Sequence, residues 1–515
     1  MPIAPESIVE PESSPAPREP TRCAHRAASR NSSQRWLAPA ALAALVVLFY
    51  WPSVGFEFVN WDDPWYVVEN PVVQSWRPAG LWSLATEVHV RNYAPLTLAS
   101  HLVEHTLWGL WPGGYHLTNV VLHALNAVLV WALVRQVTGN RFVAWTTAAL
   151  FAVHPVQVES VAWISSRKGL LSATFILACL IRQLRPERTP RDEGIGLLFL
   201  AAALLTKAIA VVVPAVVLAY DLIVRKRPFA EVLSRQIVPG CLCLCFLAIT
   251  AGAQTTELGG LRDHLDLGRG RVLAVDAIVL WKYVLLLLWP VDLSVLYDVP
   301  TQGIGWTAAL AAAGWGVAAA VLFRLRRRSP LVPFAALAAL LFLLPVLNLI
   351  PITTLMNDRY LYLPSITAFG LFAAAVRWGT AWPALEALRS PGESPAGTPL
   401  PSREGPGEGL RSPRRGPPSP NPSLRGRGAI VAVAVVACAL ATQRHLPVWR
   451  DGVALWRQAA RVSPGLAVVQ YQLADALFER GETGEAILVL ERALAECDPD
   501  EIDRARIERR LAERR

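Results

Sequence analysis

The sequence predicts an all-α, polytopic membrane helical bundle of about eleven spans, followed by a short helical tail. The first observation is composition: 53% of the 515 residues are hydrophobic and only 17% are charged, whereas soluble domains carry nearer a quarter charged residues. The second is the set of 19 tryptophans, which suit the boundary between membrane and water. The third is the recurrence of long apolar runs. Together with a mean hydropathy of +0.35, these observations exclude an ordinary water-soluble enzyme.

The apolar runs approach the length of membrane-spanning helices, which need about 20 mainly apolar residues. One further run, 272–290, contains Asp276 and Lys282. Counting it as a span would place the arginines of 324–328 on the outer face, against the positive-inside rule. We therefore expect 254–303 to form an outer region with a re-entrant or interfacial helix. The expected spans are 36–54, 116–135, 140–154, 168–184, 194–207, 208–224, 236–253, 304–324, 331–350, 360–378 and 429–443.

Two basic segments flank the apolar part of the chain. Five arginines lie between Arg18 and Arg35, and residues 389–428 hold seven arginines, ten prolines and eight glycines against three acids. Such composition cannot bury enough apolar surface to fold, so 1–35 and 381–428 are expected to be disordered and cytoplasmic. We expect them to contact anionic membrane lipids. No nucleic acid partner is expected, since no aromatic platform accompanies the arginines.

The rest of the chain divides into a transmembrane domain (36–380), a last transmembrane helix (429–443) and an extracytoplasmic tail (444–515). In the tail, small and large apolar residues alternate in a pattern that resembles a tetratricopeptide repeat. Such arrays usually need about three units, so the tail should lean on the membrane domain or bind a protein partner. The pattern consists of Leu473, Ala474 and Leu477, then Gly481, then Ala486, Leu490, Ala493 and Leu494, and finally Pro499.

Two adjacent carboxylates, Asp62 and Asp63, directly follow the first span. Neighbouring carboxylates repel each other, which raises one pKa and suits a general base. The alternative is a pair of solvated loop residues. The sequence leaves open which of the two would be the base.

A polar stripe runs along one face of the second expected span. It consists of His116, Asn119, His123 and Asn126, at spacings of three, four and three residues. Polar side chains in a span usually face the bundle interior. They either support a site or join helices by hydrogen bonds, and the sequence favours joining.

Charged and polar residues also cluster at two later points. The segment from His154 to Lys168 includes Glu159 and Arg167; His154 and Glu159 are candidates for orienting a substrate, and Arg167 with Lys168 for binding a phosphate. The alternative for these two cations is snorkelling at a helix end.

The second point is the segment 356–364, where Asp358, Arg359 and Tyr360 start a span on the outer face. The positive-inside rule does not favour an arginine on the outer face, so we expect this arginine to bind an anionic ligand. Lys207 and Lys282 are weaker candidates of the same kind.

These motifs resemble the transmembrane-and-tetratricopeptide-repeat (TMTC-type) O-mannosyltransferases and their bacterial relatives, which have the GT-C architecture. The resemblance covers about residues 40–380 and 430–500. It implies a polyprenyl-phosphate-linked sugar as donor, catalysis on the outer face and an acidic base in the first loop. The motifs that carry it are Asp62–Asp63, His116 to Asn119 with His123, His154-Pro155 with Glu159, Arg167-Lys168, Asp358-Arg359-Tyr360 and the tail repeat. Gln157, Gly169 and Ala94 (in Asn92-Tyr93-Ala94-Pro95) depart from residues common in relatives.

We therefore expect an inverting membrane glycosyltransferase (EC 2.4.1) that moves a mannose-like sugar from a polyprenyl-phosphate donor to a hydroxyl of an exported protein. Asp62 and Asp63 are the expected catalytic residues, and Arg359, Arg167 and Lys168 the expected phosphate ligands. No cofactor is expected with certainty, and a divalent metal at Asp62 and Asp63 is left open. The expected substrate-binding or supporting residues are His154, Glu159, Asn92, Tyr93, His116, Asn119, His123, Asp358 and Tyr360.

The alternative function is a non-catalytic membrane anchor whose repeat tail recruits periplasmic proteins. An enzyme requires that the polar motifs of the outer loops meet in one place, whereas a scaffold does not. In either case the chain is expected in a bacterial inner membrane, with its N-terminus cytoplasmic and its tail outside.

Overall fold

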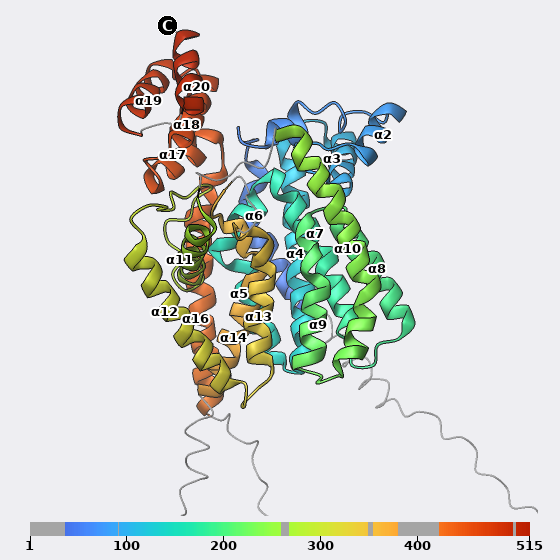
Figure 1. Cartoon of the computed structure of the whole chain (residues 1–515). Coiled ribbons are helices and arrows are strands. Elements are labelled where there is room, and N and C mark those ends of the chain that lie inside the picture. The colour runs from blue at the N-terminus through green and yellow to red at the C-terminus, as the bar shows by residue number, and fades with distance from the viewer. Residues whose placement is uncertain are drawn as a thin grey trace, which may run out of the picture. The chain divides into compact units, whose positions relative to one another are not determined.

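Figure 1 shows a computed structural model of the chain, in which residues 37–90, 92–258, 267–348, 354–379, 422–497 and 501–514 are described. The chain divides into two units after Ala41, and the following account concerns the second, Leu42–Arg515. Its described elements are helices, with one isolated bridge between His89 and Asn92 and no β-strand among the described residues. The predicted all-α class is confirmed.

Within the described residues, five helices are long and apolar enough to cross a membrane. A bent pair, Phe229–Arg235 with Ile237–Thr250 at 49°, is a candidate for a sixth. The chain is therefore an integral membrane protein, as predicted. The five helices are Leu37–Gly55, Pro112–Thr138, Ile164–Gln183, Gly305–Leu325 and Gly426–Trp449.

The expected count of eleven spans stays a prediction, because several expected runs form shorter helices. The helices α5 (Arg141–Val153), α8 (Pro190–Leu204) and α14 (Pro364–Gly379) have 13, 15 and 16 residues. The runs Ala208–Ile223 and Leu331–Val346 are also short and apolar; each combines an α-helix, α9 (Val213–Ile223) or α13 (Leu331–Leu343), with a 3₁₀ turn. Apolar composition predicted these runs, but it does not report where a turn shortens a helix.

The expected outer region contains one long helix, α11 (Arg269–Leu288). It is not among the helices apolar enough to span, and Asp276 accepts a hydrogen bond of 2.8 Å from the side chain of Asn348. It packs against α12 (Gly305–Leu325) through stacked rings of Trp281 and Trp315. Whether α11 lies in the membrane or along its surface stays a prediction.

The last membrane helix, α16 (Pro422–His445), begins before the expected 429. Residues 422–428, which were expected to be disordered, are helical, and proline is tolerated in the first turn of a helix. The other expected disordered residues, 1–35 and 381–421, lie outside the described residues.

The core of the bundle is a series of helices that lie side by side (Figure 1). The long helix α4 (Pro112–Thr138) packs on α5 and α7 (Arg167–Gln183), α7 packs on α8, and α5 packs on α14, which in turn packs on α13. Successive helices reverse direction, so their connections alternate between two ends of the bundle. One end carries the turns 154–166 and 205–212, and the opposite end carries the turns 184–189 and 224–228.

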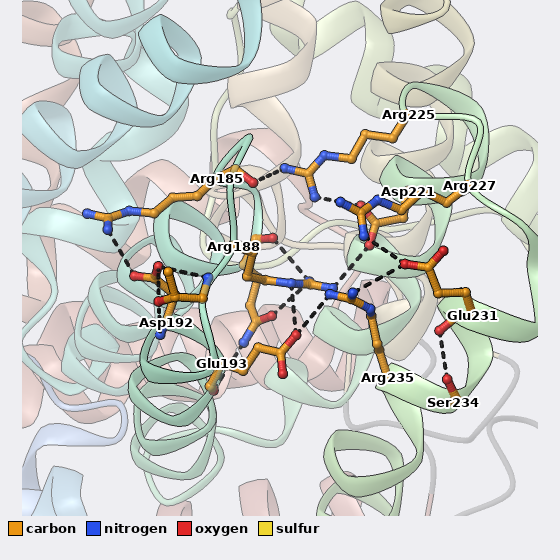
Figure 2. A network of polar contacts seen from close by, with 12 residues as sticks. Arg185, Arg188, Asp192, Glu193, Asp221, Arg225, Arg227, Glu231, Ser234 and Arg235 are labelled. Carbon is orange, nitrogen blue, oxygen red and sulfur yellow. Dashed lines mark hydrogen bonds and ion pairs between the residues drawn. The ribbon is translucent and has the colours of Figure 1, made fainter.

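A network of ion pairs fixes that opposite end (Figure 2). Arg225 lies 2.8 Å from Asp221, which also pairs with Arg188 at 3.5 Å. Arg235, from α10 (Phe229–Leu258), lies 3.0 Å from Glu193 of α8. These arginines tie the α7–α8 turn to the α9–α10 turn.

The tail consists of α17 (Gly452–Val462), α18 (Ala467–Glu479), α19 (Thr483–Glu496) and α20 (Glu501–Ala512), each packed on the next. Most of the apolar pattern is buried, with Leu477 and Leu490 fully buried and Leu494 half-buried, whereas Pro499 lies outside the described residues. Gly481, at φ +79°, ends α18 in the left-handed conformation that favours glycine. The tail contacts the loops of the membrane domain. Its assignment as a tetratricopeptide repeat stays a prediction.

Candidate active site

Asp63 is buried and held by the backbone on both sides of it. One carboxylate oxygen accepts from the backbone amide of Val59 at 3.1 Å, and the other accepts from the amide of Ser165 at 3.0 Å and from its hydroxyl. Burial raises the pKa of Asp63 to about 6, although these hydrogen bonds lower it. With an exposed fraction of 1%, Asp63 cannot reach a substrate without a rearrangement. Its contacts tie the first loop to the turn before α7.

Asp62 points to a different partner. Its carboxylate lies 3.5 Å from the ammonium of Lys168 at the start of α7, and its side chain keeps 22% of its surface exposed. The same ammonium donates to the hydroxyl of Tyr66 at 3.1 Å and lies over its ring. Asp62 is therefore the accessible carboxylate of the adjacent pair, and Asp63 fixes the backbone from which it projects.

Arg359 pairs with Glu159, two hundred residues earlier in the chain. Glu159 also accepts from the backbone amide of Arg359 at 2.7 Å. Burial alone would lower the pKa of Arg359, but Glu159, Tyr360 and Asp62 together raise it above its ordinary value. The guanidinium lies 5.1 Å from the centre of the Trp163 ring. Arg359 is thus a permanently charged, partly exposed cation within the electric field of Asp62.

Lys207 is the third cation of this group. It lies in the turn after α8, and its ammonium is 3.9 Å from the position that a Cβ on Gly169 would take. Among the described residues, no carboxylate lies within ion-pair distance of it. Burial, then repulsion from Lys168 and Arg359, lowers the pKa of Lys207 to about 7, while Glu159 partly offsets this. Three cations and two carboxylates therefore share one electrostatic environment, which is an arrangement found at functional sites.

Arg167 lies apart from this group, although it was expected to bind phosphate beside Lys168. Its side chain is fully buried; it pairs with Glu104 at 2.7 Å, donates to the side chain of Asn119 and donates to the backbone carbonyl of Tyr115 at 2.8 Å. Adjacent residues at the start of a helix point about 100° apart, so Lys168 faces the cluster while Arg167 faces the bundle. These contacts favour a structural role for Arg167.

The polar stripe of α4 joins helices, which is the role that the sequence favoured. The amide of Asn119 donates to the carbonyl of Trp163 at 2.9 Å, and His123 shares a hydrogen bond of 2.8 Å with the hydroxyl of Tyr362. Asn126 donates to the carbonyl of Leu170 at 3.0 Å. His116 contacts the carbonyl of Glu57 at 3.4 Å. All four side chains are buried, and none lies on the surface that carries Asp62.

Three other expected supporting residues, His154, Asn92 and Tyr93, have partners other than Asp62 and Arg359. His154 is buried against the ring of Phe369. Asn92 donates to the hydroxyl of Tyr66 at 3.2 Å, and Tyr93 donates to the carbonyl of Ala85 at 2.8 Å.

Two others belong to the segment that carries Arg359. Asp358 accepts from the hydroxyl of Tyr297 at 2.5 Å and from the amide of Ser294 at 3.2 Å. Tyr360 shares a hydrogen bond of 3.0 Å with the hydroxyl of Thr354. Both therefore hold the segment in place.

Sequence reasoning missed two side chains of the site, Ser165 and Tyr66, and also Glu104, the buried partner of Arg167. Glu104 interrupts an otherwise apolar stretch, and a lone acid in such a stretch predicts a buried cationic partner. Neither Ser165 nor Tyr66 carries a comparable signal, because hydroxyl residues are common in loops.

In the part of the chain that the structure describes, the aspartate pair has no additional metal ligands beside it. Among the described residues, no three His, Cys, Asp or Glu side chains gather in a way that could hold a metal ion. Both oxygens of Asp63 already accept hydrogen bonds, and Asp62 faces Lys168. The two carboxylates therefore do not converge on one point.

The chain is similar in sequence to protein O-mannosyl-transferases. It is 34% identical over 212 residues to TMTC1 of Mus musculus, a match that covers 36% of this chain and 22% of that protein. It is 35% identical over 159 residues to TMTC1 of Homo sapiens (28% and 17%), and 30% identical over 148 residues to TMTC3 of Mus musculus (27% and 16%). The matches thus span about a fifth of the length of these relatives. No family model matches the sequence.

Two solved structures have a related course of the chain, each at 13% sequence identity and a TM-score of 0.43. One is ArnT from Cupriavidus metallidurans bound to undecaprenyl phosphate, where the match covers 83% of this chain and 80% of that one. The other is the archaeal oligosaccharyltransferase AglB from Archaeoglobus fulgidus in complex with an inhibitory peptide and a dolichol-phosphate, with 79% and 55% covered. The sequence homologues are TMTC proteins, and the predicted resemblance to TMTC-type O-mannosyltransferases is confirmed.

Proposed function

We propose that this protein is an inverting membrane glycosyltransferase that moves a mannose-like sugar from a polyprenyl phosphate to a hydroxyl of an exported protein. The observation that carries the proposal is the ion pair of Asp62 with Lys168 beside two further cations, since Lys168 and Arg359 lower the pKa of Lys207 and Asp62 raises that of Arg359. The sugar and the acceptor are proposed from the relatives, which are named protein O-mannosyl-transferases.

Asp62 is the base in this proposal. Its carboxylate takes the proton from a serine or threonine hydroxyl of the acceptor, and the hydroxyl oxygen forms a bond to the anomeric carbon of the sugar. The bond between that carbon and the phosphate oxygen breaks, and the polyprenyl phosphate leaves with the electron pair. Attack opposite the leaving group inverts the configuration. Asp63 supports this step from the side by holding the backbone of the loop.

The three cations stabilise the negative charge that grows on the leaving phosphate. Arg359 offers a planar pair of donors suited to phosphate oxygens, and its pairing with Glu159 fixes its orientation. Lys168 and Lys207 add point charges. The two carboxylates pair with Arg359 and Lys168 in the free protein, so Lys207 gains most from an arriving anion.

A lipid-linked donor fits the place of the site in the fold. The cations lie at helix ends, at the turns before α7, after α8 and before α14. A polyprenyl chain can remain among the membrane helices while its phosphate and sugar reach these turns. A protein acceptor would approach from the side of the loops and the tail. The predicted extracytoplasmic position of this face makes the acceptor an exported protein.

The test is transfer itself. Purified full-length protein in lipid nanodiscs is given tritiated mannose on a polyprenyl phosphate, together with a peptide rich in serine and threonine. We expect label in the peptide and release of polyprenyl phosphate. Parallel reactions with other polyprenyl-phosphate sugars identify the donor. Absence of transfer with every donor and with extracts of exported proteins would leave the scaffold alternative as the better account.

Lys207 gives the donor affinity a pH dependence. Because its pKa is lowered to about 7 in the free protein, its ammonium is charged below that pH and loses its proton as pH rises through it. The charged groups that face it are Glu159, Lys168 and Arg359. We therefore expect the KM for the donor to rise by up to about tenfold per pH unit above pH 7.

The Lys207→Arg variant should keep a low donor KM at high pH, since a guanidinium does not lose its proton there. The Lys207→Met variant should have a high donor KM at all pH values. Initial rates at varied donor concentration, measured across neutral pH, check both expectations. If the wild-type KM does not change with pH and the Lys207→Met variant has the same KM as the wild type, Lys207 is not part of the phosphate site.

A further inference from the structure

The first helix of the tail, α17, contacts both loops on which the proposed site depends. It lies between the first loop, which carries Asp62, and residues 293–298, which hold the segment of Arg359. The contacts come from α17, from Ser463 directly after it and from Gln472 of α18, and they are hydrogen bonds and one ring contact.

The contact with the first loop is made through Asn60. Its side-chain oxygen accepts from the indole nitrogen of Trp456 at 2.9 Å, and its amide donates to the backbone carbonyl of Gln472 at 3.2 Å. The ring of Trp61 packs edge-on against that of Trp456, which is fully buried. A Cβ on Gly452 would lie 2.3 Å from the oxygen of Asn60, so a larger residue there would displace the Asn60 side chain. Asn60 and Trp61 directly precede Asp62.

The contact with 293–298 is made by Gln458, two residues after Trp456, and by Ser463 at the end of α17. The side-chain amide of Gln458 donates to the carbonyl of Leu293 at 3.1 Å. The hydroxyl of Ser463 accepts from the amide of Asp298 at 3.0 Å and donates to the carbonyl of Leu296 at 3.2 Å. Both ends of 293–298 are thereby fixed to the tail.

Residues 293–298 hold the segment of Arg359 in turn. Asp358 accepts from Tyr297 and from Ser294, and Asn357 donates to the carbonyl of Val295 at 2.6 Å. Residues 293–298 therefore link Gln458 and Ser463, through hydrogen bonds on both sides of this segment, to the residues that precede Arg359. A second, shorter link leads from Trp456 to the backbone beside Asp62.

We propose that α17 sets the separation between the proton-accepting side and the phosphate-binding side of the site, with Trp456 positioning Asp62 and Gln458 positioning Arg359. The tail is then a part of the active site and not only a platform for partners. This inference rests on the proposed function, because it takes Asp62 as the base and Arg359 as the phosphate ligand.

Three neighbouring positions on α17 provide the test. The Trp456→Phe variant keeps an aromatic ring but removes the donor to Asn60, and Gln458→Ala removes the donor to Leu293. Arg457→Gln is the matched control, because Arg457 is exposed and pairs with Glu485 within the tail. Each full-length variant is assayed in nanodiscs with tritiated polyprenyl-phosphate mannose and the serine- and threonine-rich peptide.

We expect Trp456→Phe to lower kcat by about tenfold with little change in the donor KM, because a small displacement of the base affects the reacting geometry. We expect Gln458→Ala to raise the donor KM several-fold, roughly three- to tenfold, through the displaced phosphate ligand. Arg457→Gln should match the wild type in both. Hydrogen exchange should quicken at 57–63 in Trp456→Phe and at 293–298 in Gln458→Ala.

The inference is overturned if both variants keep wild-type kcat and KM. It is also overturned if both lose activity only in proportion to their folded yield, without one changing kcat and the other the donor KM. Asp62→Asn separates the two levels of the proposal. If Asp62→Asn is inactive while Trp456→Phe is normal, the role of α17 fails alone. If Asp62→Asn transfers sugar at the wild-type rate, the proposed function fails first.

Discussion

Replacing Asp62 by Asn is expected to lower the rate of sugar transfer by a factor of roughly 10²–10⁴, because the general base is lost. Asparagine has nearly the same size and keeps a hydrogen-bonding oxygen. Because Asp62 is partly exposed and its ion pair with Lys168 spans 3.5 Å, the substitution costs little folding energy. Binding of the donor should be largely preserved. Initial rates and binding of polyprenyl phosphate, measured on the same preparation, check both statements.

Asp63→Asn is the informative companion. Three donors, two amides and one hydroxyl, point at the oxygens of Asp63, and an asparagine NH₂ group would face one of them donor to donor. We expect a less stable loop and a partial loss of kcat, with the residual activity still depending on Asp62. The opposite ranking, with Asp62→Asn active and Asp63→Asn inactive, would make Asp63 the base.

Much of the fold could be predicted from hydropathy because a membrane leaves few choices. Backbone groups in lipid must bond within their own helix, so apolar runs such as 116–135 and 304–324 become helices. The same reasoning does not count crossings. The run 331–350 contains a helix that ends at Leu343 and continues as a 3₁₀ turn. Such breaks depend on packing against neighbouring helices, and the hydropathy of a single segment does not show this packing.

The site was predictable in its residue types and only partly in its roles. Adjacent aspartates after a span, and an arginine at the start of another, are unusual enough to stand out, and the structure brings Asp62 and Arg359 into one electrostatic environment. Whether the outer-loop motifs form one catalytic site, as an enzyme requires, stays a prediction. The sequence could not separate Arg167 from Lys168, since the direction of each side chain depends on the rotation of α7 about its own axis. Nor could it show that Glu104 would meet Arg167 sixty-three residues later.

The ion pair of Arg167 with Glu104 yields the second large prediction, which concerns folding. Both side chains are nearly inaccessible, with exposed fractions of 0% and 5%. Burial would raise the pKa of Glu104, but Arg167 and then His101 lower it to about 2. Since that pKa lies below the ordinary value of 4.5, the stabilisation is present above pH 4.5 and is lost as pH falls toward about 2. The pair is therefore charged at neutral pH.

Removing one partner leaves a buried charge without compensation, which costs about 3–5 kcal/mol. We expect Glu104→Gln and Arg167→Met each to lower the yield of monodisperse protein and its unfolding temperature in detergent. The double variant should recover much of the loss, because two neutral side chains of similar size replace the buried pair. Fluorescence-detected size-exclusion chromatography and thermal unfolding of the single and double variants measure this directly.

The contrast with Arg359 gives this test its value. Arg359→Ala should fold well enough to be purified while it loses donor binding, whereas Arg167→Met should lose stability first and regain activity in the double variant with Glu104→Gln. A phosphate ligand cannot be restored by neutralising its protein partner, since the phosphate still needs the positive charge. If the double variant is stable but inactive, Arg167 contributes to the reaction, and the phosphate-binding role that its sequence motif suggested must be reinstated.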